Sequence, residues 1–107
     1  MIKKGKIAVI GDKDSVLAFK AVGMDTFSAT NVFETNDLLK HLKDDYAVIF
    51  ITETLAEQAA DTLEKLKSRP YPAVIPIPGA GGSNGYGKQS IKRDVEKAIG
   101  ADILFGE

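Results

Sequence analysis

The stretch YAVIFI at residues 46–51 decides the fold of this chain. A continuous apolar run of this length is typical of a strand that is buried on both faces, as strands of parallel sheets are. The run IAVI at residues 7–10 repeats this pattern and ends at Gly11. Because helical patterns separate the apolar runs, the sequence predicts an α/β fold with a parallel sheet.

Two weaker strands are expected at about residues 24–29 and at residues 73–77. The second of them contains Pro76, which cannot donate to a strand ladder, so this strand is expected at a sheet edge. We therefore expect four parallel strands in the order 2-1-3-4, with right-handed crossovers and flanking helices. This is a doubly wound, receiver-like or Rossmann-like arrangement.

Three helices are expected between the strands. Asp12 or Asp14 is expected to cap the first helix, and Gly23 to end it. Thr35 or Asn36 is expected to cap the second. The third helix is expected to bury one stripe and to expose the opposite side. Its buried stripe consists of Leu55, Ala59, Leu63 and Leu66.

Composition limits the function before any motif is considered. At 107 residues the chain predicts one domain, and 44% hydrophobic residues with 27% charged residues are typical of a soluble globular protein. Fourteen basic and fifteen acidic side chains leave a net charge of −1, which argues against nucleic-acid binding. The absence of cysteine excludes disulfides and thiol chemistry. The apolar runs are too short for a signal peptide or a membrane span.

The composition changes after residue 78. Residues 79–87 contain five glycines, which predicts a mobile connection. We divide the chain into a sheet domain at residues 1–78, a Gly-rich linker at 79–88, and an amphipathic helix with a tail at 89–107. The helix has a narrow apolar seam within a sector of roughly 100°, which suits packing along another helix. It could instead fold back over its own sheet. The seam consists of Ile91, Val95, Ala98 and Ile99.

The first helix is apolar nearly all round. Lys20 is its one strongly polar member within residues 16–22, so one side is expected to face something beyond its own sheet. Neighbouring helices could supply that contact. The apolar residues are Val16, Leu17, Ala18, Phe19, Ala21 and Val22.

One motif resembles a phosphate-binding loop. Residues 82–88 fit the pattern GxxxxGK between a strand and a helix, but Gln89 stands where a Ser or Thr hydroxyl would hold magnesium. The motif also follows the last strand, after two prolines. We favour a flexible linker over a nucleotide site.

An acidic cluster follows the strand ends. Asp12 and Asp14 follow the first strand and Glu53 follows the third, and sites of parallel α/β sheets form at these ends. The arrangement resembles bacterial receiver domains, but the acceptor position holds Thr52 or Glu53, and no fifth strand supplies a basic partner. We favour helix capping by the three carboxylates. His41, the only histidine, has no nucleophile or orienting acid and is expected on the surface.

Four stretches together resemble the F subunit of the V-type and archaeal A-type rotary ATPases. They are IAVIGDKDSVLAF at residues 7–19, VIFITE at 48–53, PAVIPIP at 72–78 and SIKRDVEKAIGADIL at 90–104. The likeness covers nearly the whole chain in the right order. Ala18 departs from it, because the family often has glycine there, and the linker is more glycine-dense than expected.

The resemblance implies a noncatalytic subunit of the central rotor stalk. Such a protein binds the coiled coil of the stalk's D subunit, and its C-terminal arm reaches toward the catalytic A/B ring, which couples ATP hydrolysis or synthesis to H⁺ or Na⁺ transport. It implies a cytoplasmic protein that meets the membrane only through the complex, with no cofactor, metal or catalytic residue. A receiver-like or nucleotide-sensing regulatory domain is the alternative. Partner-binding residues are expected to be Phe19, Ile91, Val95, Ala98, Ile99, Ile103 and Leu104.

Overall fold

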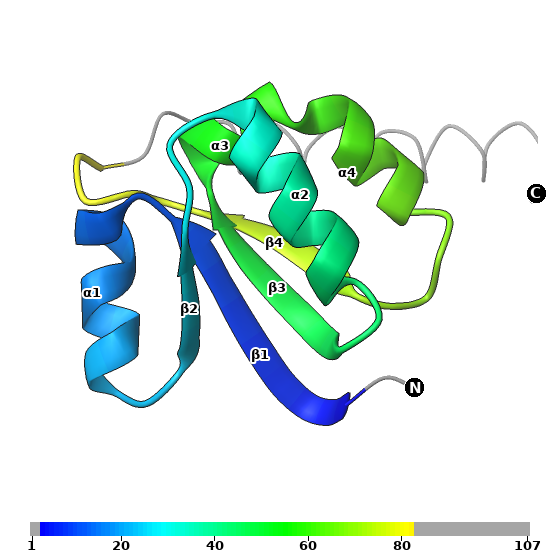
Figure 1. The fold of residues 1–107 in the computed structure, drawn as a ribbon, viewed down its shortest axis with the longest axis horizontal. Coiled ribbons are helices and arrows are strands. Elements are labelled where there is room, and N and C mark those ends of the chain that lie inside the picture. Colours follow the sequence, from blue (N-terminus) through cyan, green and yellow to red (C-terminus); the bar gives the residue numbers. More distant parts are fainter. Residues whose placement is uncertain (1–2, 83–107) are drawn as a thin grey trace, which may run out of the picture.

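A four-stranded parallel sheet forms the centre of the protein (Figure 1). The computed structural model describes residues 3–82, and its strands lie in the order β2-β1-β3-β4. The predicted α/β class, the parallel pairing and the order are therefore confirmed. The strands are β1 (Lys3–Gly11), β2 (Asp25–Ser28), β3 (Tyr46–Thr52) and β4 (Ala73–Ile77).

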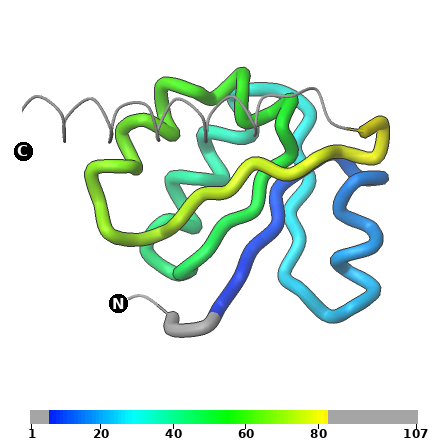
Figure 2. Tube along the Cα trace, turned by 180° about the vertical axis from the view of Figure 1, so that it is seen from behind, coloured from blue at the N-terminus to red at the C-terminus, as the bar shows by residue number. Residues whose placement is uncertain are grey.

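Helices cover the two faces of the sheet unequally. They are α1 (Lys13–Ala21), α2 (Val32–Leu42), α3 (Glu53–Gln58) and α4 (Ala60–Leu66). The main core joins one sheet face to α2, α3 and α4, and Ile10, Leu39 and Ile51 are among its fully buried side chains. Seen from the opposite side, β4 runs across the front and α2 and α4 lie behind the strands (Figure 2). Helix α1 packs against β1 and β2.

Helix α1 lies on the face opposite the main core. The chain crosses from β1 outward to β2 through α1, and it returns past β1 to β3 through α2. Since both crossovers are right-handed, the two helices fall on opposite faces. Val9 and Val16 are buried but lie outside the main core, as expected for a second, smaller layer under α1.

The predicted start of the second helix is wrong. Helix α2 begins at Val32, and Asn31 is its cap, because the Asn31 side-chain oxygen accepts the Glu34 N–H at 2.9 Å. The Glu34 carboxylate reaches back and accepts the Thr30 N–H at 2.8 Å, which completes a reciprocal capping arrangement. Thr35 is instead a buried residue of the helix, and its hydroxyl donates to the Asn31 carbonyl.

The predicted third helix is two helices. The break lies at Ala59, which has φ −99° and ψ 22° and joins α3 to α4. The predicted buried stripe is nevertheless confirmed, since all four of its members are buried. The edge position of β4 is confirmed as well, and so is the end of α1 at Gly23, which has φ +87°. Within residues 3–82 no helix has the length and apolar character needed to cross a membrane.

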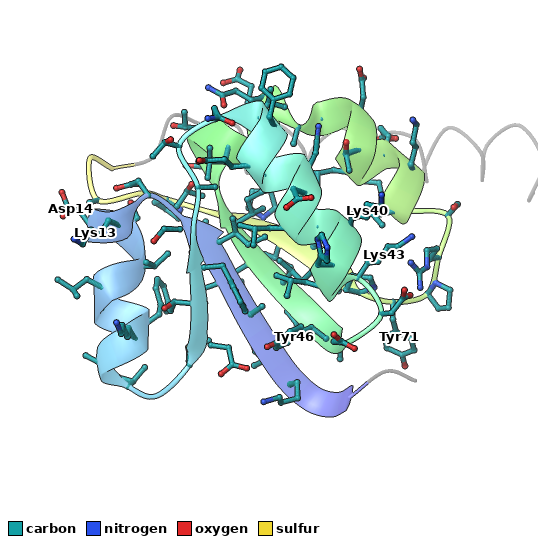
Figure 3. The ribbon with its side chains drawn as sticks, viewed as in Figure 1. Lys13, Asp14, Lys40, Lys43, Tyr46 and Tyr71 are labelled. Carbon is teal, nitrogen blue, oxygen red and sulfur yellow. The ribbon has the colours of Figure 1, made fainter. Side chains whose placement is uncertain are left out.

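A polar network joins three strands at the end where β1 and β3 begin. The Tyr46 hydroxyl donates to the Asp25 carboxylate at 2.7 Å, and the Lys6 ammonium lies 3.1 Å from the same carboxylate oxygen. The Tyr46 ring packs edge-on against Phe27. Figure 3 shows Tyr46 at the lower end of β3. The network therefore ties β2, β1 and β3 together where the short β2 begins.

Ionisation of Tyr46 is expected to destabilise the fold. Burial, together with the hydrogen bond to Asp25, raises the pKa of Tyr46 to about 12 from its ordinary value of 10.0. The stabilisation is fully present below the unfolded-state pKa and is lost as the pH rises through the folded-state pKa. As the pH rises from the unfolded-state pKa to the folded-state pKa of Tyr46, we expect the free energy of unfolding to fall more steeply in the wild type than in Tyr46→Phe. Urea unfolding across this pH range measures the difference, and parallel curves would contradict it.

Candidate protein-interaction surface

The carboxyl ends of the strands are occupied by helix caps. The Asp12 carboxylate accepts the Ser15 N–H at 3.2 Å and the Ser15 hydroxyl at 2.5 Å, and the hydroxyl bond is the main cause that lowers the pKa of Asp12. Capping by Asp12 is thus confirmed. Asp14 is not the cap but an exposed residue of the first turn of α1, where a carboxylate suits the positive helix end (Figure 3).

Glu53 occupies a different position from the other two carboxylates. It is buried in the first turn of α3, and the residue before it, Thr52, is the N-cap without a side-chain cap bond. The capping role expected for Glu53 is therefore wrong, although the carboxylate still lies at a helix start. Across residues 3–82 no group of three or more His, Asp or Glu residues is placed to hold a metal ion.

The end of β1 packs closely against β3 and α1 at Gly11. A Cβ at Gly11 would lie 2.6 Å from Thr52 Cγ2 and 3.2 Å from Val16 Cγ1. In open α/β sheets ligands bind in the crevice at this point, because the strand order reverses there. Here the approach of β1, β3 and α1 leaves no room even for a methyl group at Gly11.

The start of the Gly-rich stretch lies at the same edge of the sheet and contacts Ser15. The Ala80 N–H donates to the Ser15 hydroxyl at 2.9 Å, and residues 79–82 form a turn through the bond from the Gly82 N–H to the Gly79 carbonyl. Figure 1 shows this turn beside the N-terminal end of α1. Ser15 therefore links the Asp12 cap to the turn. Residues 83–88 of the GxxxxGK motif lie outside the described residues.

His41 lies on the exposed side of α2. Its Nδ1 lies 2.7 Å from the backbone carbonyl oxygen of Asp37, one helical turn earlier, and 3.7 Å from a carboxylate oxygen of the same residue. The predicted surface position is confirmed.

The largest exposed apolar side chains within residues 3–82 include two on or next to α1. Leu17 is 61% exposed and Val22, which follows the last turn, is 74% exposed. Ala18 and Ala21 between them are exposed as well. We call these four residues the outer face of α1. The opposite side of the helix buries Val16 and half-buries Phe19, so Phe19 faces the domain rather than the solvent.

A second apolar area lies on the same face of the sheet. Val9, Phe50 and Ile75 form one row across β1, β3 and β4, because the register pairs Val9 with Phe50 and Phe50 with Ile75. Burial decreases along this row, from the fully buried Val9 through the half-buried Phe50 to Ile75, which is 41% exposed. Helix α1 covers the β1 end of this face, and the β4 end is the open part.

Sequence reasoning identified only part of these surfaces. It recognised that α1 is apolar all round, but not which side the sheet would cover. It did not single out Phe33, which is 81% exposed in the first turn of α2. The spacing of the α2 residues that face the core places Phe33 on the side of the helix away from them, and this signal was available. The six expected partner-binding residues from Ile91 to Leu104 lie outside the described residues.

The comparisons with known proteins identify the family of the chain. Residues 7–95 match the family described as ATP synthase (F/14-kDa) subunit. The chain belongs to this family of ATP synthase F subunits. The matched range extends past the described turn into the linker and most of the predicted C-terminal helix.

Relatives of the F family match over almost their full length. The chain is 47% identical over 100 residues to the V-type ATP synthase F subunit of Clostridium botulinum, covering 92% of this chain and 97% of the relative. It is 46% identical over 100 residues to the V-type ATP synthase F subunit of Fusobacterium nucleatum, covering 92% and 95%. It is 33% identical over 105 residues to the A-type ATP synthase F subunit of Thermococcus gammatolerans, covering 92% and 97%.

A methyl group at Gly11 is expected to destabilise this F-family domain. Gly11→Ala forces its Cβ against the short, buried Thr52 side chain, and overpacking of this kind costs about 1–3 kcal/mol. Gly81→Ala is the matched control, because a Cβ there meets nothing within 4 Å. Urea unfolding measures both variants. Adding Thr52→Ser to Gly11→Ala removes Cγ2 and should recover part of the lost free energy of unfolding. Equal stability of Gly11→Ala and Gly81→Ala would refute the packing argument.

Proposed function

We propose that this F-family protein is a noncatalytic subunit of the central stalk of a V-type or A-type rotary ATPase. In this proposal it binds the D subunit of the stalk, and its C-terminal arm contacts the catalytic A/B ring. It helps to couple ATP hydrolysis or synthesis in that ring to the transport of H⁺ or Na⁺. It is cytoplasmic and meets the membrane only through the complex.

The observation that carries the proposal is the family match over residues 7–95, which covers nearly all of the sheet domain, the linker and the first part of the arm. The geometry of the domain supports it. At the sheet edge where ligands of this topology bind, Gly11 packs against Thr52, and the turn at residues 79–82 is hydrogen-bonded to Ser15. Exposed apolar side chains gather elsewhere, on the outer face of α1 and at the β4 edge. Exposed apolar side chains that lie together on one helix, such as those of α1, are candidates for protein–protein contacts.

The isolated protein is expected to bind its cognate D subunit and to hydrolyse no ATP. Co-expression of tagged protein with the D subunit, followed by size-exclusion chromatography, tests the first part, and a coupled ATPase assay tests the second. An unrelated coiled-coil protein serves as the binding control. Failure to form a stable complex with the D subunit would remove the proposal, and ATP turnover by the isolated protein would contradict the noncatalytic role.

The predicted seam at residues 89–99 is expected to serve the partner and not the domain. Ile91→Asp combined with Val95→Asp places two charges in the seam, which should weaken binding to the D subunit or coupling in the assembled ATPase. The thermal transition of the sheet domain should stay within a few degrees of the wild type. Differential scanning calorimetry and the binding assay together decide the matter. If the double variant loses its thermal transition, the helix belongs to the core of the domain.

A further inference from the structure

Helix α1 has a buried side and an apolar exposed side. Val16 and Phe19 turn toward the sheet, whereas Leu17, Ala18 and Ala21 are exposed. At 100° per residue these three exposed positions fall within a sector of roughly 100°, which is the width of a single helix-packing stripe. The exposed Asp14 lies in the same sector, in the first turn of the helix. Val22 extends the stripe just past the last turn. Both alanines lie on the same side of Leu17, away from the lysines, and leave the helix backbone accessible to close approach.

Two lysines border this stripe on the same side. Lys13 and Lys20 are seven residues apart, so they lie one above the other on one flank of Leu17. Both are exposed, and neither takes part in the ion pairs found within residues 3–82. This spacing corresponds to the flanking heptad positions of a coiled coil, whose charges select and orient a partner helix.

The position of Lys13 is not explained by the stability of α1. All four described helices have an acidic residue in the first turn, which suits the positive end of the helix dipole: Asp14, Glu34, Glu53 and Asp61. Lys13 is the first residue of α1, where the same dipole disfavours a positive charge. Lys20, in the last turn, is placed favourably. The charge of Lys13 therefore adds nothing to the stability of α1.

We propose that the outer face of α1, bordered by Lys13 and Lys20, is a docking surface for an amphipathic α-helix of another component of the stalk. The partner helix has an apolar seam that covers Leu17 and Ala21, and Asp or Glu residues beside the seam that pair with the two lysines. The apolar contact supplies affinity, and the paired charges supply register and orientation. This inference rests on the proposed function, since it assigns the coiled coil of the stalk partner to a particular face of the domain.

Leu17→Glu in the full-length protein tests the apolar contact. Leu17 is exposed, so the variant should retain the wild-type thermal transition, and its affinity for the cognate D subunit should fall by about tenfold or more. Phe33→Glu is the matched control, because Phe33 is also a large exposed apolar residue of a helix but lies on the other face of the sheet. Isothermal titration calorimetry measures both. If wild-type protein binds the D subunit and Leu17→Glu binds equally well, the inference is wrong while the proposed function stands. If wild-type protein does not bind, both are wrong.

Charge reversal tests the carboxylates of the partner. Lys13→Glu with Lys20→Glu should slow association with the D subunit and abolish the decrease of the wild-type rate with added salt. Lys40→Glu, on α2, is the control, and Figure 3 shows Lys40 far from Lys13. Association rates by surface plasmon resonance at several salt concentrations give the answer. If the association rate of the double variant depends on salt as strongly as that of the wild type, the proposed acidic residues of the partner are wrong.

Two other occupants of the outer face would overturn the proposal. If Leu17→Glu shifts the amide resonances of residues 89–99 in the isolated protein, the chain's own C-terminal segment occupies this face. If the isolated protein is a dimer that Leu17→Glu dissociates in sedimentation experiments, a second copy occupies it. Unchanged resonances and a monomer before and after the substitution support docking of a partner helix.

Discussion

A parallel sheet has to be covered on both faces, and this protein is organised by that constraint. Parallel strands are connected by crossovers that place helices over the faces, and their apolar residues point to both sides. The β2-β1-β3-β4 order sends α2, α3 and α4 to one face and leaves α1 alone on the other within residues 3–82. One helix is too narrow for four strands. The decrease in burial from Val9 to Ile75 is the direct result.

The sheet is closely packed at Gly11, next to the point where this topology usually forms a ligand site. Gly11 permits close contact between β1, Thr52 and α1, and the Ser15 hydroxyl bonds to both Asp12 and Ala80. A nucleotide-binding protein of this architecture uses glycines to bring backbone near a phosphate. Here the glycine brings backbone near a side chain. At Gly11 the glycine therefore serves the packing of the domain.

The sequence was sufficient for the sheet but not for the details of the helices. Continuous apolar runs predicted β1 and β3, and Pro76 predicted the edge position of β4, because both signals depend only on strand burial and on a missing N–H. The start of α2 was misplaced because Asn31 and Glu34 form a reciprocal cap, whereas Thr35, an equally good capping residue by type, is buried. The break at Ala59 has no sequence signal, since alanine is a strong helix former.

The interaction surface was less predictable than the fold for a related reason. An apolar helix shows in its sequence how much surface it must bury, but which side is covered depends on the crossover geometry. In α1 that geometry turns Phe19 inward and Leu17 outward, although both are large apolar residues of one helix. The expectation that Phe19 contacts a partner came from the all-round apolar character of α1. Phe19 is half-buried, and its contact with a partner stays a prediction.

The position of the turn at residues 79–82 connects the outer face of α1 with the C-terminal arm. The Ser15–Ala80 hydrogen bond holds this turn against the N-terminal end of α1, so the chain enters its linker beside Lys13. The six residues at 83–88 span at most about 20 Å when fully extended. In the proposed complex, a helical partner that docks on α1 is therefore within reach of the seam at residues 89–99. Where the seam meets the same partner as α1, the two contacts, joined by a short linker, reinforce each other because the second forms at high effective concentration. The Ser15–Ala80 hydrogen bond sets the place beside α1 from which the linker starts, and so it keeps the second contact close to the first.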